Sequence, residues 1–192
     1  MYHSPLSIEA MSLQHLMTLI EKRHSVRRYI KAPIPTQHEE ILRDLIDRCN
    51  ALGNLKMELR LDEPDPFESW MSHYGMFSNV QHYIALVGES APDLEERIGY
   101  YGEVLVLQAT ALGLGTCWVA GTYDRRKSRV ALAPTDELIA LITIGIPQHP
   151  GSSRRTKSIT SLSRTVDPIP EWFLNGMRAV QLAPTAMNQQ KF

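Results

Sequence analysis

The sequence has few of the features that define several common protein classes. It contains only two cysteines, Cys49 and Cys117, among 192 residues, and they do not form a C-x-x-C pair. A disulfide-stabilised secreted scaffold is therefore disfavoured, and we expect a cytoplasmic protein with reduced thiols. The N-terminal stretch has no basic start followed by a long apolar segment, and no run of about 18 apolar residues occurs anywhere. Neither a signal peptide nor a membrane span is predicted.

Net charge and familiar catalytic motifs are also scarce. The formal net charge is −1 and the pI about 6.7, which does not favour broad electrostatic binding to nucleic acid. No Walker A, H-E-x-x-H or G-x-S-x-G pattern is found, and the seven histidines do not have metal-ligand spacing. We therefore expect no nucleic-acid, membrane or metal partner.

What the sequence does contain is an alternation of helical and strand patterns. Ser12 and Thr36 are expected to cap the first two helices, with Glu39 completing a capping box at the second. Gly53 should end the second helix, and Gly113 and Gly115 the third. The predicted helices lie within 12–25 and over about 37–51, 92–112 and 167/168–182/183, and the strands lie at 56–62, 81–88, 116–121 and within 137–147.

This alternation predicts one domain, residues 1–192, built on an α/β or α+β sheet covered by helices. The third helix has the sequence VLVLQATAL at its centre, which is apolar on nearly every side. We expect it to run through the core.

The segment KRHSVRRY, residues 22–29, could form a binding face. If it is extended, Arg23, Ser25, Arg27 and Tyr29 share one side, with the two arginines about 13 Å apart. Guanidinium groups bind phosphate and carbonyl oxygens through paired hydrogen bonds. The segment is therefore either the grip for a long anionic ligand or a solvated basic turn after a helix.

The glycine-rich turn before TCWVAG also has two interpretations. Gly113 and Gly115 either end the helix or let the backbone approach a flat ligand. A dinucleotide fingerprint would need a third glycine where the chain has Trp118, so a Rossmann phosphate loop is not supported. We expect Cys117 and Trp118 to belong to the core rather than to a site.

Two loops leave alternatives open. The Gly/Ser-rich loop after residue 150 is either a solvated charged loop or a phosphate clamp, formed by Arg154, Arg155 and Lys157. The loop 62–79 has four aromatic residues that either roof a pocket or pack the loop onto the core, namely Phe67, Trp70, Tyr74 and Phe77.

In combination and in this order, these segments resemble the flavin-dependent nitroreductase family. RHSVRRY resembles its R-x-S-x-R-x-[FY] signature, and YGEVLVLQATALGLGTCWVAG resembles its long central helix and G-L-G-T-C-W turn. ELIALITIGIPQ resembles the following core strand, RRTKSI the late R-x-K-x-[LI] loop, and APTAMNQQ the A-P-S-x-x-N-x-Q segment. The matches run from about residue 12 to the end of the chain.

The resemblance implies an α+β sandwich in which helices flank a central mixed sheet around a long buried core helix. It also implies FMN as cofactor, NADH or NADPH as hydride donor, and a homodimer with the flavin near the subunit interface. No catalytic acid or base is implied, because the flavin carries the hydride. The implied FMN contacts are Arg23, His24, Ser25 and Arg27 for the phosphate, ribityl chain and pyrimidine edge, Arg155 and Lys157 for the phosphate, Pro184, Thr185 and Asn188 for the flavin, and the backbone near Ala120 and Gly121 for flavin N5.

One part of the family pattern is displaced. In most members A-P-S-x-x-N follows the second helix, but here APTAMNQQKF follows the last helix, about 130 residues later. This resembles a subgroup of nitroreductases with the segment in the C-terminal half, where the chain continues past Asn-Gln-Gln-Pro-Trp. This chain has Lys191 and Phe192 instead, so it is either shortened or continues beyond residue 192. A terminal segment without a following strand is prone to fraying.

The leading hypothesis is an FMN-dependent oxidoreductase that passes hydride from NAD(P)H through flavin N5 to an electron-poor acceptor such as a nitroaromatic or a quinone. Two alternatives stay open: a non-catalytic flavin-binding sensor or storage protein, and a structural partner without flavin. Flavin binding separates the last from the other two, and NAD(P)H turnover separates those two from each other.

Overall fold

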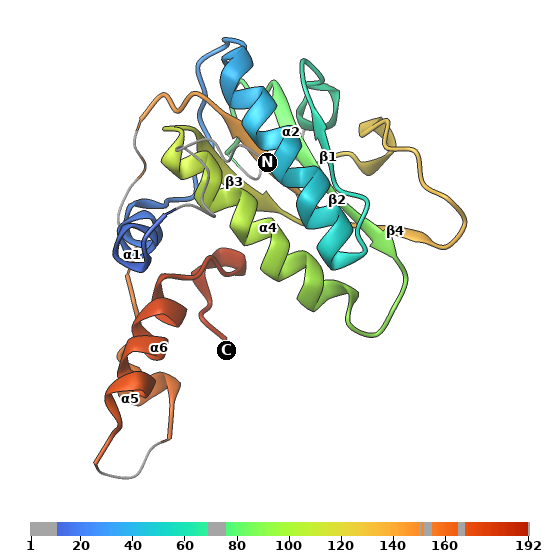
Figure 1. The fold of residues 1–192 in the computed structure, drawn as a ribbon. Helices are drawn as coiled ribbons and strands as arrows, with labels where there is room; N and C mark the ends of the chain where they lie inside the picture. Colours follow the sequence, from blue (N-terminus) through green and yellow to red (C-terminus); the bar gives the residue numbers. More distant parts are fainter. Residues whose placement is uncertain (1–10, 69–75, 150, 152–154, 165–167, 192) are drawn as a thin grey trace.

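A computed structural model describes residues 11–68, 76–149, 151, 155–164 and 168–191 (Figure 1). In these residues, no helix is long and apolar enough to cross a membrane. The 3-10 turns are η2 (Asp65–Phe67), η3 (Arg125–Lys127) and η4 (Ala186–Asn188). The helices and strands are, in chain order, α1 (Leu13–Lys22), α2 (Thr36–Gly53), β1 (Glu58–Arg60), β2 (His82–Glu89), α4 (Leu94–Ala111), β3 (Gly115–Val119), β4 (Asp136–Gly145), α5 (Ile159–Leu162) and α6 (Glu171–Leu182).

The four strands form one sheet in the order β1-β2-β4-β3. All pairs between these strands are antiparallel, so the expectation of a mixed sheet needs correction. Parallel pairing in the described residues is limited to isolated bridges, from Ser25 to Thr116 and from Arg28 to Ser78. Residues 25–29 bridge several different partners and so form no continuous ladder. The α+β class is confirmed.

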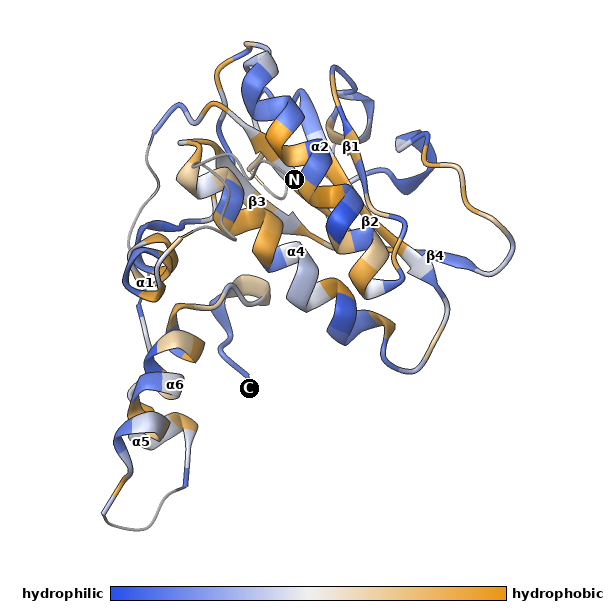
Figure 2. Ribbon diagram, viewed as in Figure 1, coloured by the Kyte–Doolittle hydropathy of each residue, from blue (hydrophilic) through white to orange (hydrophobic). Residues whose placement is uncertain are grey.

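Both faces of the sheet are buried along β2 and most of β4, which explains why these two strands are apolar without alternation. Ile84 and Leu86 of β2 face α2 and α4, which cover one side (Figures 1 and 2). Tyr83 and Val87 face the other side, where they pack with Phe67. β1 is shorter than predicted, and only its central residue is buried.

The aromatic residues of the loop 62–79 that can be described pack the loop onto the core. The ring of Phe67 lies 5.6 Å from that of Phe77 and 6.1 Å from that of Tyr83, measured between centroids. Of the two interpretations, this arrangement favours packing over a pocket roof. Trp70 and Tyr74 lie outside the described residues.

The long helix α4 is the core helix that the sequence predicts. It buries Leu105, Val106 and Ala109 against the sheet and α2. Gly102 lets β3 approach, since a Cβ atom there would lie 2.4 Å from the indole ring of Trp118.

Two helix starts differ from the prediction for the same reason, a proline. Ser12 caps α1 as expected, because its hydroxyl accepts the His15 N–H at 3.3 Å. Thr36 is instead the first residue of α2, where the Pro35 carbonyl accepts the N–H groups of residues 38 and 39. Glu39 pairs with Arg43 at 2.8 Å rather than completing a capping box. α6 likewise begins after Pro170, later than predicted, and Asp167 lies outside the described residues.

The helix ends also differ in part. The residue that turns left-handed after α2 is Asn54, with φ 48°, and Gly53 is still helical. Gly113 ends α4 with φ 74°, as expected. Gly115 belongs to β3, where a Cβ atom would lie 2.9 Å from Val26. Its small size therefore permits close packing of the Val26 side chain against β3, rather than the approach of a ligand. α6 ends at Leu182, as the following proline requires.

Helices α5 and α6 project from the body of the molecule, and the segment after α6 turns back toward α4 (Figure 1). None of the residues of α6 is buried, and Trp172 near its start is 74% exposed. This turn back brings residues 182–188 close to the end of α1.

Candidate functional site

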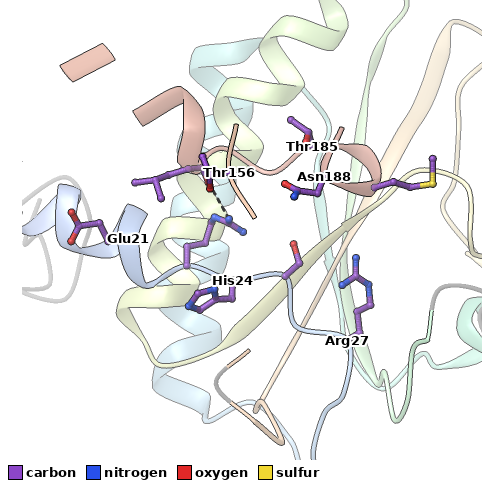
Figure 3. A pocket seen from close by; sticks show the side chains of 10 residues that line it. Glu21, His24, Arg27, Thr156, Thr185 and Asn188 are labelled. Carbon is purple, nitrogen blue, oxygen red and sulfur yellow. Dashed lines mark hydrogen bonds between the residues drawn. The ribbon is translucent and has the colours of Figure 1, made fainter. Parts of the chain in front are cut away.

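A pocket of about 380 Å³ lies where the end of α1, the loop after β4 and the C-terminal segment meet (Figure 3). This volume falls within the range of about 300–1,000 Å³ that is usual for small-molecule sites. Thr185 and Asn188 lie across the pocket from His24 and Arg27. The lining residues are Glu21, Arg23, His24, Ser25, Arg27, Thr156, Leu182, Thr185, Met187 and Asn188.

The pocket brings together six of the eleven predicted site residues, from segments about 160 residues apart in the chain. Tyr29, which shares a face with the arginines in a regular strand, is instead buried, and its hydroxyl donates to the Val26 carbonyl at 2.6 Å. The six residues in the pocket are Arg23, His24, Ser25, Arg27, Thr185 and Asn188, and the five that do not line it are Ala120, Gly121, Arg155, Lys157 and Pro184.

The position of β3 explains why Ala120 and Gly121 do not line the pocket. Ser25 bridges Thr116 near the start of β3, and this places the pocket at that end of the strand. Ala120 follows the other end of β3, about 13 Å further along an extended chain. The assignment of these two residues to flavin N5 stays a prediction.

Arg23 is held between the core helix and the C-terminal helix. Its side chain is only 5% exposed, and its Nε lies 3.5 Å from the Glu103 carboxylate of α4. Its Nη2 donates to the carbonyl of Leu182, the last residue of α6, at 3.2 Å (dashed in Figure 3). The other Glu103 oxygen accepts the Trp118 indole N–H at 2.9 Å. Sequence patterns gave no signal for Glu103, because its partners are distant in the chain.

The C-terminal segment is anchored to the loop 155–157. Lys157 Nζ donates to the Gln189 carbonyl at 2.6 Å, and the Lys157 N–H donates to the side-chain oxygen of Gln190 at 2.8 Å. Gln190 is buried, and its own N–H donates to the Thr185 hydroxyl at 3.1 Å. Gln190 matches the last position of the A-P-S-x-x-N-x-Q pattern, which was the available sequence signal for its role.

Asn188 has one satisfied and one unsatisfied polar atom in the pocket. Its Nδ2 donates to the Arg155 carbonyl at 2.8 Å. Its Oδ1 is buried and has no hydrogen-bond partner among the described residues. A buried acceptor without a donor costs about 1–3 kcal/mol, so a ligand N–H or O–H at this point would be favoured.

The pocket lining has charged side chains of both signs, those of Glu21, Arg23 and Arg27. Arg27 lines the pocket, and within the described part of the chain no hydrogen bond or ion pair of its side chain is found. Burial raises the pKa of the neighbouring Cys117 thiol, and the charge of Arg27 offsets this only in part. Cys117 is therefore a core residue, as expected, and not an activated nucleophile.

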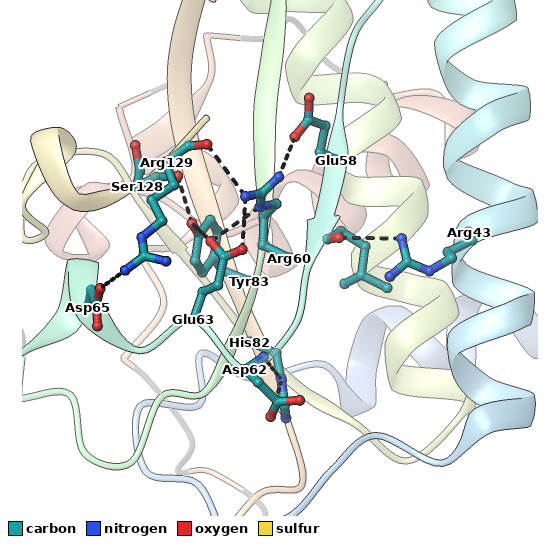
Figure 4. Close-up of polar contacts among 11 residues, drawn as sticks. Arg43, Glu58, Arg60, Asp62, Glu63, Asp65, His82, Tyr83, Ser128 and Arg129 are labelled. Carbon is teal, nitrogen blue, oxygen red and sulfur yellow. Dashed lines mark hydrogen bonds and ion pairs between the residues drawn. The ribbon is translucent and has the colours of Figure 1, made fainter. Parts of the chain in front are cut away.

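A second polar cluster, around β1 and β2, has a structural role (Figure 4). Arg60 pairs with Glu58 at 3.3 Å and Glu63 at 2.8 Å, and Tyr83 donates to the Ser128 carbonyl at 2.8 Å. Burial raises the pKa of Tyr83, and the Glu63 carboxylate raises it further. None of these residues lines the pocket. Across the described ranges of the chain, no group of three or more His, Cys, Asp or Glu side chains could hold a metal ion.

Solved structures with the same fold are nitroreductase-like proteins. A putative nitroreductase from Thermotoga maritima is 23% identical, with a TM-score of 0.60 over 99% of this chain and 71% of that one. A putative nitroreductase from Desulfovibrio desulfuricans, in complex with FMN, is 19% identical, with a TM-score of 0.63 over 81% and 98%. A putative NADH oxidase from Clostridium acetobutylicum is 18% identical, with a TM-score of 0.56 over 72% and 94%. The fold is therefore the nitroreductase fold.

The sequence gives the same answer more specifically. The model of the family described as "Putative TM nitroreductase" matches residues 15–192. The chain belongs to this family. No curated protein matches the chain.

Proposed function

We propose that the protein is an FMN-dependent oxidoreductase. The observation that carries this proposal is the pocket itself, since two segments of the nitroreductase pattern, residues 23–27 and 185–188, meet there from opposite ends of the chain. Membership of the family and the FMN complex of the Desulfovibrio relative support the same cofactor.

The residues of the pocket fit the chemistry of FMN. Arg27 and His24 offer N–H donors for a phosphate or for carbonyl oxygens, and Ser25 offers a hydroxyl for the ribityl chain. The unpartnered Asn188 Oδ1 needs a donor, and FMN has a ring N–H and several ribityl hydroxyls. Arg155 lies next to the pocket, and its contact with the phosphate is part of the same proposal. The phosphate contact that the family resemblance implies for Lys157 is not part of it, because Lys157 Nζ already donates to the Gln189 carbonyl.

When bound, FMN supplies the acceptance and return of hydride, and the protein supplies binding, orientation and electrostatics. The Arg27 charge would favour the reduced, anionic form of a flavin held beside it. NADH or NADPH is the proposed donor, which the name of the Clostridium relative supports. The proposed acceptor is an electron-poor aromatic such as a nitroaromatic or a quinone. We assign no catalytic acid or base.

The displaced segment belongs to the same proposal. We place the chain among nitroreductases in which A-P-[ST]-x-x-N follows the last helix rather than the second. The contacts of Gln190 and Lys157 support this, because they give the segment a defined position beside the pocket.

We also propose that the protein is a homodimer. The arm formed by α5 and α6 projects from the body, and α6 presents Trp172 to solvent although it has an apolar side. A second copy of the chain would cover this surface and lie near the pocket, because α6 leads directly into Thr185.

Flavin binding and turnover test the function in one preparation. The purified protein is titrated with FMN while its visible spectrum is recorded, and oxidation of NADH and NADPH is then followed with a nitroaromatic and with a quinone. Bound flavin with turnover is expected. Bound flavin without turnover with any acceptor would favour the storage or sensor alternative, and absence of FMN binding would contradict both flavin functions.

A further inference from the structure

We propose that Arg23 and Lys157 are positioning residues, two cationic pins that hold the segment 182–190 against the pocket. Each donates to backbone carbonyls of this segment, Arg23 at its start and Lys157 at its end. The pins therefore flank Thr185 and Asn188, the two predicted site residues of this segment that line the pocket. The pinning itself does not depend on the proposed function, and only its effect on flavin affinity does.

The first pin joins the C-terminal end of α6 to the core. The last carbonyls of a helix have no partner within the helix and carry its partial negative charge. Arg23 meets one of them, at Leu182, and its Nε faces the Glu103 carboxylate 3.5 Å away. Glu103 belongs to the core helix α4, and its carboxylate also accepts the Trp118 indole N–H. The position of Leu182 is thereby tied to α4 and β3.

The second pin joins the end of the segment to the loop 155–157. Lys157 donates from Nζ to the carbonyls of Gln189, at 2.6 Å, and Gln190, at 3.4 Å. Its carbonyl accepts the Gln181 side-chain N–H at 2.7 Å, so residue 157 contacts both sides of the turn. The Gln190 side chain closes the turn by donating to the Gln181 carbonyl at 3.3 Å.

The backbone between the pins needs such support. Met187, Asn188 and Gln190 have φ angles of 50°, 54° and 48°, in the left-handed region that residues other than glycine rarely adopt. Such conformations persist only when surrounding contacts hold them.

The contacts of these two cations distinguish them from Arg27. Arg23 and Lys157 already have anionic or carbonyl partners, and Arg23 is almost completely buried. Arg27 lines the pocket without such a partner in the described residues. We therefore assign binding of the ligand anion to Arg27. Arg23 and Lys157 are assigned the positioning of Asn188.

Hydrogen exchange of the C-terminal peptide tests the pins without any ligand. Arg23→Gln, Glu103→Gln and Lys157→Met should each speed exchange of residues 183–191 by about tenfold, the effect of losing one charge-assisted hydrogen bond. The matched controls Lys22→Gln and Lys191→Met remove exposed cations and should leave the exchange rate unchanged. Lys157→Arg keeps a cationic donor at this position and should exchange as slowly as the wild type, unlike Lys157→Met. Unchanged exchange in the three variants would overturn the proposal.

The ratio of FMN to riboflavin affinity separates a pin from a phosphate ligand. Loss of a pin should weaken the binding of FMN and of riboflavin by the same factor. The reason is that Asn188, which would be misplaced, contacts the part of the molecule that both flavins share. A tenfold or larger fall of the ratio in Arg23→Gln or Lys157→Met would show direct phosphate contact and contradict the assignment. If the wild-type protein binds neither flavin, the proposed function fails, and the exchange experiment still decides whether the pins exist.

Discussion

At the scale of single residues, the pocket is organised by which polar groups are already satisfied. Arg23 has an ion-pair partner and a carbonyl acceptor, whereas Asn188 retains a buried oxygen without a donor among the described residues. Arg27 is the pocket cation for which the described residues provide no partner. A ligand that fits the pocket would therefore place a hydrogen-bond donor at Asn188 Oδ1 and an anionic group or a polarised carbonyl near Arg27.

The role of Arg27 can be measured directly. Arg27→Ala should weaken FMN binding by about tenfold to a hundredfold, because a hydrogen bond to a charged group is worth about 1.5–3 kcal/mol. Fluorescence titration of FMN gives the dissociation constant. Lys22→Ala serves as the control, since Lys22 is an exposed residue at the end of α1. Equal flavin affinity in the two variants would rule out a ligand role for Arg27.

At the scale of elements, contact between α4 and β3 places Glu103 and Trp118 beside Arg23. Gly102 makes this contact possible, because any larger side chain would overlap the indole ring. Gly99 lies on the same helix and is exposed, and a Cβ atom there would meet no neighbouring group within 4 Å among the described residues. The two glycines therefore allow steric and helix-propensity effects to be compared.

Replacing these two glycines should have opposite effects. Gly102→Ala should destabilise the protein by about 1–3 kcal/mol through overpacking against Trp118. Gly99→Ala should stabilise it by about 0.5–1 kcal/mol, because alanine loses less conformational entropy in a helix. Urea denaturation followed by circular dichroism measures both. A neutral Gly102→Ala variant would mean that α4 and β3 are less closely packed than described.

The ion pair between Lys56 and Asp136 joins the segment just before β1 to the start of β4, with Nζ and Oδ1 2.6 Å apart. The hydrogen bond from Lys56 lowers the pKa of Asp136, and the Ala133 N–H, which also donates to the carboxylate, lowers it further. A carboxyl group whose pKa is lower in the folded state stabilises the fold at pH values above its unfolded pKa of about 3.9. This contribution is lost as the pH falls through the lower, folded pKa.

The consequence is a stability difference that depends on pH. Lys56→Met should lower the urea midpoint at pH 7, and the difference from the wild type should shrink as the pH is lowered below about 4. Lys22→Met is the control for removing an exposed lysine and should change the midpoint little at either pH. A Lys56→Met defect of equal size at pH 7 and in acid would exclude the ion pair as its cause.

At the scale of the whole molecule, the body and the arm differ in how well they are buried. The sheet, α2 and α4 form a continuous core, but α6 has no buried residue and contacts α1 and α5 at the edge of the molecule. An amphipathic helix gains stability mainly by packing its apolar side. A second copy of the chain would supply that packing, and this is the basis for the proposed homodimer.

A charge on the arm should therefore disrupt association. Trp172→Glu should convert a dimer to a monomer, halving the mass measured by light scattering after size-exclusion chromatography. Leu132→Glu introduces the same charge at another exposed apolar residue, in the loop before β4, and should leave the mass unchanged. A wild-type protein that is already monomeric would refute the dimer, and an unchanged mass for Trp172→Glu would refute the interface.

Most of the elements could be predicted from the sequence because their signals are local. Apolar residues three and four apart predicted α1 and α2, and a long stretch that is apolar on nearly every side predicted α4. Continuous apolar runs predicted β2 and β4. The order of the strands and their antiparallel pairing could not be predicted, since pairing depends on segments far apart in the chain. The errors at the starts of α2 and α6 arose where a proline carbonyl, rather than a side chain, accepts the first N–H groups.

The same division applies to the candidate site. The sequence by itself determined which residue types are available, including the arginines at 23 and 27 and the segment from Pro184 to Gln190. Only the tertiary structure decided that both segments line one pocket, that the Glu103 carboxylate pairs with Arg23, and that Lys157 and Gln190 hold residues 182–190 in place. The physical reason is that a hydrogen bond depends on distance and direction in space, which residue identity and spacing along the chain do not specify.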